Sequence, residues 1–202
     1  MKPICHVVGA GDFSPSLLSL AEQDLLIAAD AGYEHLTSAG FRPHLYIGDG
    51  DSLGFTPEEV DTVVLPVVKD DTDVHAALKE GLARSFRSFR IYGALGGKRF
   101  SHSLANLQVL AFLAQNGAEG VLVDEHYTVS LLTEGVHTFD FTGGYFSLFD
   151  FTGTGLVSVR GAKYPLSRAS LPAHLTLGTS NEGTKETAIE VHKGAFYLVR
   201  EP

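Results

Sequence analysis

The sequence is poor in cysteine, in long apolar runs and in positive charge. Its 202 residues include one cysteine, Cys5, which excludes a disulfide framework and a cysteine-rich zinc site. No run of about 18 apolar residues occurs, and this excludes a transmembrane helix. Residues 1–11 lack the apolar segment and cleavage site of a secretory signal, so we expect a cytoplasmic protein with no membrane partner.

Negative charge outnumbers positive charge in this chain. Lys and Arg total 15 against 24 Asp and Glu, so the formal net charge is -9 at pH 7. A protein that binds duplex nucleic acid needs a basic surface, and we therefore expect no nucleic-acid partner. An acidic protein can still bind polyphosphates when Mg²⁺ lies between the two sets of negative charge.

Apolar residues make up 44% of the chain, which suffices for a genuine core, and in residues 1–125 they follow two alternating patterns. Short strand-like runs occur at residues 4–8, 25–29, 45–47, 62–65, 90–92 and 121–123. Between them lie helical signals at Ser14-Pro15, 31–40, the capping box Thr56-Pro57-Glu58-Glu59, 74–86 and 104–114. Short apolar strands between helices are typical of a parallel sheet covered on both faces, so we predict an α/β domain.

Residues 126–202 have a different composition. Helical periodicity fades, and short segments rich in Gly, Thr, Phe and Val alternate with turn residues. This pattern is typical of a small antiparallel sandwich or barrel. We therefore predict an N-terminal parallel-sheet α/β domain over residues 1–125, followed by a C-terminal antiparallel β-sandwich domain over residues 126–202.

Acidic residues gather where the predicted parallel strands end. They follow the second, third and fourth strands, at Asp30, Asp49, Asp51, Asp70, Asp71 and Asp73. Ligands bind beyond the carboxyl ends of strands in open parallel sheets. Each close pair of carboxylates costs of order 1 kcal/mol or more, and a hard cation such as Mg²⁺ removes that cost. A metal site explains all these clusters together; the alternative is a set of solvated acidic turns.

A glycine-rich turn, residues 93–97, lies between a predicted strand and a predicted helix. Glycines allow backbone N–H groups to approach a ligand, and a helix N-terminus attracts anions. Lys98 and Arg99 add positive charge there, and His102 is close in sequence. The turn indicates a phosphate site, or else a tight turn followed by two solvated cations.

A second glycine motif follows the first predicted strand. Val8-Gly9-Ala10-Gly11-Asp12 begins like a dinucleotide-binding fingerprint, but Ser14 stands where its third glycine belongs. The match is incomplete, and no P-loop sequence occurs in the chain, so neither motif assigns a nucleotide site.

A series of short motifs runs along both halves of the chain. They are Ala29-Asp30-Ala31-Gly32, Gly48-Asp49-Gly50-Asp51-Ser52, Lys69-Asp70-Asp71-Thr72-Asp73, Gly96-Gly97 through Arg99, His102-Ser103-Leu104-Ala105-Asn106, Ser147-Leu148, Gly161-Ala162-Lys163-Tyr164-Pro165-Leu166 and Gly178-Thr179-Ser180-Asn181-Glu182. In this order and spacing they resemble the motifs of the thiamin pyrophosphokinase family. The resemblance spans almost the whole chain.

The resemblance implies an enzyme that transfers the diphosphoryl group of ATP to the hydroxyl of thiamin. The products would be thiamin diphosphate and AMP. It further implies Mg²⁺ as cofactor, an α/β domain followed by a β-sandwich, and a homodimer with its sites between subunits.

By matching position, the resemblance also implies roles for individual residues. The metal ligands would be Asp49, Asp51 and Asp73. The catalytic carboxylates would be these three residues and Asp71. The nucleotide and polyphosphate side would be formed by Asp30, Lys69, Arg99, His102 and Asn106. Thiamin would contact Ser180 and Asn181. Either Asp71 or Asp73 could accept the proton of the attacking alcohol.

The sequence departs from the family pattern at Ser101, where an acidic residue is usual. This departure leaves the metal stoichiometry open. Two alternative functions stay open: a related diphosphokinase acting on another hydroxymethyl-type acceptor such as a pterin, and a non-catalytic nucleotide- or thiamin-binding protein. The retained acidic cluster argues against the second, because a silent binder has no need of mutually repelling charges.

Overall fold

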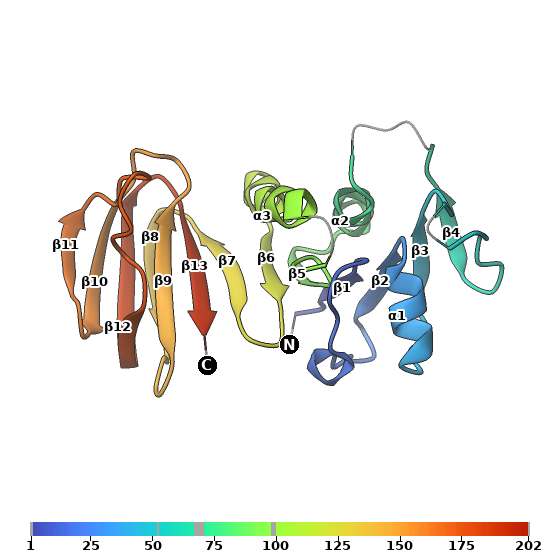
Figure 1. The fold of residues 1–202 in the computed structure, drawn as a ribbon, viewed down its shortest axis with the longest axis horizontal. Helices are drawn as coiled ribbons and strands as arrows, with labels where there is room; N and C mark the ends of the chain where they lie inside the picture. Colours follow the sequence, from blue (N-terminus) through green and yellow to red (C-terminus); the bar gives the residue numbers. More distant parts are fainter. Residues whose placement is uncertain (1, 52, 67–70, 98–99, 202) are drawn as a thin grey trace. The chain divides into compact units, whose positions relative to one another are not determined.

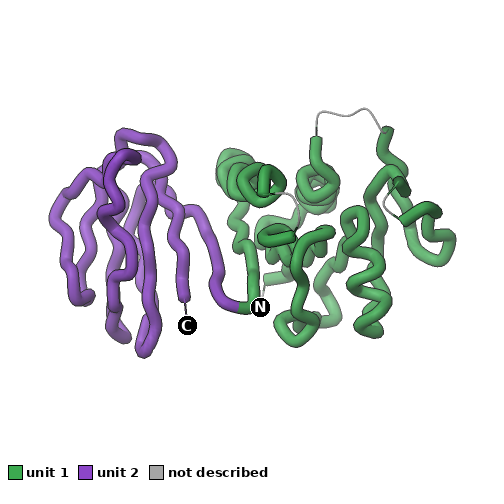
Figure 2. The backbone as a smooth tube through the Cα atoms, viewed as in Figure 1, with its two compact units in different colours: residues 1–125 green, residues 126–202 purple. Residues whose placement is uncertain are grey.

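The computed structural model describes residues 2–51, 53–66, 71–97 and 100–201. The chain divides into two compact units, Met1–Glu125 and His126–Pro202 (Figure 2). No helix in the described ranges is long and apolar enough to cross a membrane. Each unit is described by itself below.

The first unit is built on a parallel sheet whose strands run in the order β6-β5-β1-β2-β3-β4 (Figure 1). Every residue of β1, β2 and β3 is buried, as expected when both faces of a parallel sheet are covered. The elements are β1 (Cys5–Val8), the 3₁₀ turn η1 (Pro15–Leu17), β2 (Leu25–Ala29), α1 (Gly32–Ser38), β3 (Leu45–Gly48), β4 (Asp61–Val64), α2 (Asp73–Ala83), β5 (Ser88–Tyr92), α3 (Phe100–Gln115) and β6 (Glu119–Val123).

The order of the strands creates a point where the chain reverses direction across the sheet. β1 and β5 are neighbours, but the chain leaves β1 toward β2 and leaves β5 toward β6 on the opposite side. Right-handed crossovers then place α1 on one face and α2 and α3 on the other (Figure 1). The carboxyl ends of β1 and β5 flank the resulting crevice, which is where open sheets bind ligands.

Two local helix signals of the sequence do not become helices. After Ser14 the chain forms a single 3₁₀ turn, Pro15–Leu17, and no longer helix. The capping-box segment 56–59 forms bends and no helix. Thr62 Oγ1 instead donates to the carbonyls of Pro57 (3.0 Å) and Val60 (3.1 Å). With β4 beginning at Asp61, too few residues remain for the costly first helical turn.

The second unit is antiparallel, as predicted. Its strands run in the order β11-β10-β12-β9-β13-β7, and β8 pairs with β12 as well (Figure 1). Their bounds are β7 (Thr128–Leu132), β8 (Gly135–Phe139), β9 (Tyr145–Asp150), β10 (Leu156–Ala162), β11 (Leu166–Ala169), β12 (Asn181–Lys193) and β13 (Phe196–Glu201).

The long strand β12 links two groups of strands in this unit. Its first residues, Asn181 and Glu182, pair with β9, whereas its later residues pair with β10 and β8. One apolar cluster draws side chains from both groups, including Phe146, Val159 and Phe196. A shared core between two groups of strands is compatible with the predicted sandwich, which stays a prediction.

A polar network lies inside the core of the first unit. His6 of β1 is fully buried, and its Nε2–H donates to the Asp24 carboxylate (3.3 Å) while Nδ1 accepts from the Tyr92 hydroxyl (3.2 Å). Asp24 also accepts from the backbone N–H groups of Ile4 (2.8 Å) and Ala21 (2.9 Å). Burial lowers the pKa of His6, so the ring is neutral. Burial opposes ionisation of Asp24, but the hydrogen bonds from Ala21, Ile4 and His6 outweigh it and hold its pKa below the ordinary value.

We expect Asp24→Asn to reduce the free energy of unfolding by about 2 kcal/mol, because the amide NH₂ then faces a backbone donor. Both pKa values lie below their unfolded values, so the unfolded chain binds more protons. Stability of the wild type should therefore fall as pH drops below 6.5, through His6, and further below 3.8, through Asp24. Urea titrations at several pH values measure both effects. Glu22→Gln, an exposed carboxylate two positions away, is the control, and an equal loss there would contradict the assignment.

Candidate active site

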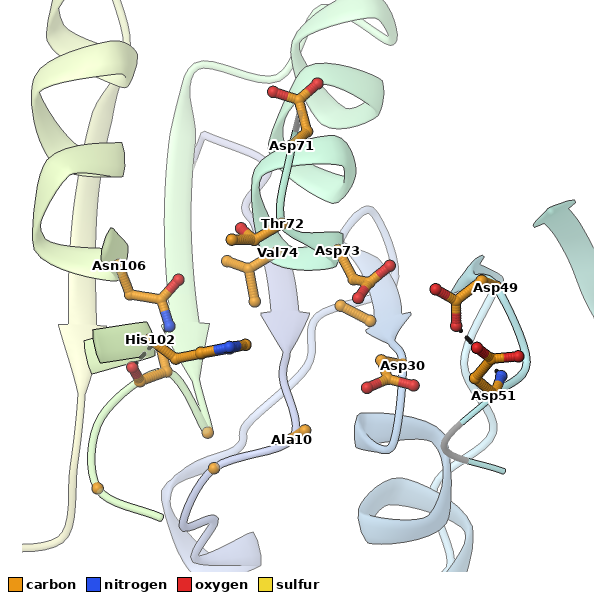
Figure 3. Close-up of a pocket in the computed structure, with 15 residues that line it drawn as sticks. Ala10, Asp30, Asp49, Asp51, Asp71, Thr72, Asp73, Val74, His102 and Asn106 are labelled. Atoms are coloured by element: carbon orange, nitrogen blue, oxygen red, sulfur yellow. Dashed lines mark hydrogen bonds between the residues drawn. The ribbon is translucent and has the colours of Figure 1, made fainter. Parts of the chain in front are cut away.

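A pocket of about 410 Å³ opens at the carboxyl ends of the parallel strands of the first unit (Figure 3). It brings together residues from six separate segments of the chain. They are Ala10, Gly11, Ala29, Asp30, Asp49, Asp51, Asp71, Thr72, Asp73, Val74, Gly93, Ala94, Gly96, His102 and Asn106. Seven of these were predicted as site residues from the sequence: Asp30, Asp49, Asp51, Asp71, Asp73, His102 and Asn106.

One wall of the pocket is acidic. Asp30 follows β2 directly, is 8% exposed, and holds a left-handed backbone (φ 53°), which is uncommon outside glycine and occurs often at functional sites. Asp49 and Asp51 follow β3, and Asp49 Oδ1 accepts from the Asp51 N–H (3.1 Å). Asp73 begins α2 behind the N-cap Thr72, whose hydroxyl accepts from the His75 N–H. Figure 3 shows the side chains of Asp30, Asp49 and Asp73 around one space.

The negative charge of the acidic wall affects a buried tyrosine in the core. Tyr46 of β3 is fully buried, and burial first, then Asp30, raises the pKa of its hydroxyl, with Asp73 and Asp49 acting in the same direction. The backbone of Gly50 opposes this shift but does not cancel it. Three carboxylates, two that follow β2 and β3 and one at the start of α2, therefore raise the pKa of the same hydroxyl. The wall is a region of concentrated negative potential.

The donor set suits a hard cation. Mg²⁺ in proteins usually takes one or two carboxylates, and waters or phosphate oxygens complete its shell. Asp30, Asp49, Asp51 and Asp73 supply such oxygens around one pocket. Among the residues that the structure describes, no three His, Cys, Asp or Glu side chains form a ready metal-binding group. The carboxylate oxygens present are of the kind that a hard cation binds.

Asp71 is placed differently from the other carboxylates. It lines the rim of the pocket, but its side chain points away from Asp30, Asp49 and Asp73 (Figure 3). Its carboxylate accepts from Lys79 Nζ (2.5 Å) and lies 3.1 Å from His75 Nδ1. The Lys79 hydrogen bond is the largest cause that holds the pKa of Asp71 below its ordinary value.

Because Lys79 and His75 already hold its carboxylate, Asp71→Asn should lower catalytic efficiency by less than about tenfold, as expected for a charge at the rim of the pocket. Steady-state kinetics with the purified variant measure this. A loss of two orders of magnitude would show instead that Asp71 leaves Lys79 and joins the reacting groups.

The opposite wall is formed by the glycine-rich turn and α3. Asn106 is 6% exposed, and its Nδ2 donates to the Ala94 carbonyl (2.7 Å), so this side chain holds the turn. His102 extends from the first turn of α3 toward the pocket (Figure 3). Lys69 and Arg99, also predicted for the phosphate side, lie outside the described residues, as does Asp70.

Ser180 and Asn181, the predicted thiamin contacts, belong to the second unit. Ser180 is exposed and has a left-handed backbone (φ 54°), and its N–H donates to Ser147 Oγ (3.0 Å). Asn181 is 6% exposed. Its Nδ2 donates to the Tyr164 carbonyl (2.8 Å), and its Oδ1 accepts from the Tyr164 N–H (3.0 Å). Asn181 thus fixes a turn, whereas Ser180 is exposed.

The pocket includes residues that the sequence analysis did not assign. Ala10 and Gly11 line it although their motif failed as a dinucleotide fingerprint. Their position after the first strand, beside a strand whose connection runs the other way, is the signal that could have found them. Thr72 was quoted within a motif but given no role; its position one residue before a helical pattern is the signal of an N-cap.

An acidic pocket faced by a glycine-rich turn thus lies at the carboxyl ends of a parallel sheet, at the switch point where open α/β sheets bind ligands. A family model of the thiamin pyrophosphokinase catalytic domain matches residues 17–122, and one of the thiamin pyrophosphokinase vitamin B1 binding domain matches residues 128–195. The chain belongs to the thiamin pyrophosphokinase family.

Solved structures agree with this family. The crystal structure of thiamine pyrophosphokinase from Bacillus subtilis is 26% identical in sequence, with a TM-score of 0.87 over 98% of either chain. That of thiamin pyrophosphokinase from Geobacillus thermodenitrificans is 28% identical, with a TM-score of 0.83 over 98% of this chain and 97% of the other. Yeast thiamin pyrophosphokinase, at 16% identity and a TM-score of 0.77 over 99% of this chain and 86% of the other, shares the fold. A comparison with curated proteins finds no match.

Proposed function

We propose that this chain is an ATP-dependent thiamine diphosphokinase, which converts thiamin and ATP to thiamin diphosphate and AMP. The observation that carries this function is the match of both family domain models, catalytic and vitamin B1 binding, in order over the two halves of the chain. The acidic pocket supports it, because phosphoryl transfer depends on positioning and charge neutralisation more than on covalent catalysis. A location in the cytoplasm stays a prediction from the sequence.

In this reaction the hydroxyl oxygen of thiamin attacks the β-phosphorus of ATP. The bond from the β-phosphorus to the oxygen bridging the α-phosphorus breaks, and AMP leaves with that oxygen. The hydroxyl proton must pass to a base. Asp71 and Asp73 are the two candidates for this base: Asp71 is held by Lys79, and Asp73, which lies within the acidic wall, is also a proposed ligand of the cation.

Asp49, Asp51 and Asp73 would hold Mg²⁺, with Asp30 beside them in the cleft. Bound there, the cation would neutralise charge on the polyphosphate. These carboxylates would place the cation beside the polyphosphate of ATP. The opposite wall, with His102 and the turn held by Asn106, would carry the nucleotide. Lys69 and Arg99 are our proposed cationic contacts to the phosphates.

The thiamin contacts are proposed in two different roles. The exposed Ser180 side chain would touch the substrate, and its strained backbone supports this because such strain concentrates at functional sites. Asn181 is buried against the Tyr164 backbone, so it would shape the thiamin site through that turn.

A homodimer is also part of the proposal. We propose that the second unit forms a β-sandwich whose outer face covers a second copy. In this unit β9 and β13 carry partly exposed aromatic residues on the outer face: Phe149 is 44% exposed and pairs with Tyr197, and the Tyr197 ring lies 5.3 Å from that of Phe151. Apolar surface of this kind on a small domain favours association.

Light scattering at micromolar concentration should therefore give about 43 kDa, twice the 21.6 kDa of one chain. Phe149→Asp should shift the protein toward 21.6 kDa, because a charge on an apolar interface is costly to bury. A fully active wild-type monomer at that concentration would rule out both the dimer and a site shared between subunits.

The direct test of function is incubation with ATP, Mg²⁺ and thiamin, followed by chromatography for AMP and thiamin diphosphate. Equimolar formation of both products is the expected result. A hydroxymethyl-pterin replaces thiamin in a parallel reaction, and faster AMP release there would favour the alternative acceptor. ATP binding without AMP formation from either acceptor would favour a non-catalytic binder.

A further inference from the structure

The loop after β1, residues 9–12, is bonded along its length to the glycine-rich turn after β5, residues 93–97. Both loops border the switch point of the sheet, and both contribute to the lining of the pocket. Gly9 N–H donates to the carbonyl of Tyr92, the last residue of β5 (2.8 Å), and within the turn Gly11 N–H donates to Gly93 O (2.7 Å) and Asp12 N–H to Leu95 O (3.3 Å).

The glycines of the incomplete fingerprint allow this close approach. A β-carbon on Gly11 would lie 2.7 Å from the carbonyl oxygens of both Gly93 and Leu95, and one on Gly9 would lie 2.8 Å from that of Gly93. Real β-carbons do not approach backbone oxygens so closely. The Gly-x-Gly sequence thus allows the contact between the two loops.

Asp12 adds a side-chain bond at the far end of the turn. Its Oδ2 accepts from the Gly97 N–H (3.1 Å), across 85 positions of sequence. The same carboxylate lies where a β-carbon of Gly96 would be, so it packs directly against that residue. Gly96 and Gly97 both have positive φ, 71° and 74°. The Asp12 carboxylate therefore contacts both of these glycines.

The turn is held from its other side by α3. Asn106 donates to the Ala94 carbonyl (2.7 Å), and Ser103 Oγ donates to the Gly96 carbonyl (3.3 Å). Asp12 itself is exposed and does not line the pocket, whereas Gly93, Ala94 and Gly96 do. Any effect of Asp12 on a bound ligand must therefore pass through the turn.

We propose that Asp12 is a positioning residue for the nucleotide. Its carboxylate fixes the Gly96–Gly97 end of the turn, so that the turn keeps the shape that receives the polyphosphate of ATP. This role rests on the proposed function of the pocket. It requires an oxygen acceptor at position 12 and does not require the negative charge, since the bond is to a backbone N–H.

The test compares Asp12→Ala with Asp12→Asn, which keeps an acceptor oxygen and removes the charge. Glu22→Ala removes an exposed carboxylate elsewhere in the same unit and is the control. In Asp12→Ala, hydrogen exchange at the Gly97 amide of the unliganded protein should be at least about tenfold faster. The KM for ATP should rise about five- to tenfold, with kcat and the KM for thiamin within about twofold of wild type. Asp12→Asn should stay within about threefold of wild type in every measurement.

Several results would overturn the proposal. Equal damage in Asp12→Asn and Asp12→Ala would show that the charge acts directly on ligand or metal. A lower KM for ATP in Asp12→Ala would show that the carboxylate competes with phosphate for the turn. Unchanged hydrogen exchange at the Gly97 amide in Asp12→Ala would show that the Asp12 carboxylate does not protect this amide. If Asp12→Ala fails to fold, Asp12→Leu, which also lacks an acceptor oxygen, takes its place with the same expectations for exchange and KM.

Failure of the proposed function would look different. The wild type would then form no thiamin diphosphate, yet hydrogen exchange at Gly97 would still distinguish the two Asp12 variants. Calorimetric titration with ATP and Mg²⁺ would report whether the turn affects nucleotide affinity in the absence of turnover.

Discussion

Asp49→Asn is expected to lower kcat for thiamin diphosphate formation by at least about two orders of magnitude. Asp49 lies at the carboxyl end of β3, lines the pocket, and acts with Asp30 and Asp73 on the pKa of Tyr46. An amide keeps the shape of the side chain but removes the charge that would hold a cation on the polyphosphate. The interaction lost is strongest when charge develops during phosphoryl transfer, so kcat should fall more than affinity for thiamin.

The fold should survive this substitution. Removing one of several repelling carboxylates relieves Coulomb repulsion, so the midpoint of thermal unfolding should stay the same or rise. Asp73→Asn should behave in the same way, whereas Asp71→Asn is the matched comparison with a small effect, because its carboxylate is held by Lys79. Unchanged kinetics in Asp49→Asn would place that residue outside the reacting site. Equal losses in Asp49→Asn and Asp71→Asn would show that the direction of the Asp71 side chain has no bearing on the reaction.

Removal of divalent cations should abolish turnover. ATP and the wall formed by Asp30, Asp49, Asp51 and Asp73 carry the same sign of charge, and they repel each other without a cation between them. A chelator in excess over all divalent ions should therefore reduce AMP formation to the level of the blank, and excess Mg²⁺ should restore it. Chromatographic product analysis measures both steps.

Circular dichroism in the same chelator is the control for unfolding. The protein should remain folded, because the core of the first unit is formed by apolar side chains and by hydrogen bonds between protein groups such as those of Asp24. Full turnover in excess chelator would contradict the metal assignment of Asp49, Asp51 and Asp73, and it would leave neutralisation to cationic side chains such as Lys69 and Arg99.

The parallel and antiparallel halves could be predicted because each leaves a local pattern. Strands buried on both faces, such as Leu25–Ala29, read as continuous apolar runs. Strands of an antiparallel domain are short and separated by turn residues, as in residues 145–155. Helix signals were less reliable where they covered few residues. The capping box at 56–59 is a valid local motif, but the strand that begins at Asp61 leaves no length for a helix.

The sequence by itself determined which residue types follow each strand, and hence that Asp30, Asp49 and Asp73 would reach one edge of the sheet. Parallel strands end at the same edge, so order along the chain is enough for that inference. Only the tertiary structure decided where each side chain points. Asp71 bonds Lys79, Asn181 bonds the Tyr164 backbone, and Asp12 bonds Gly97 across 85 positions. These choices depend on which distant backbone packs beside each residue, and hydrophobic periodicity carries no record of such long-range partners.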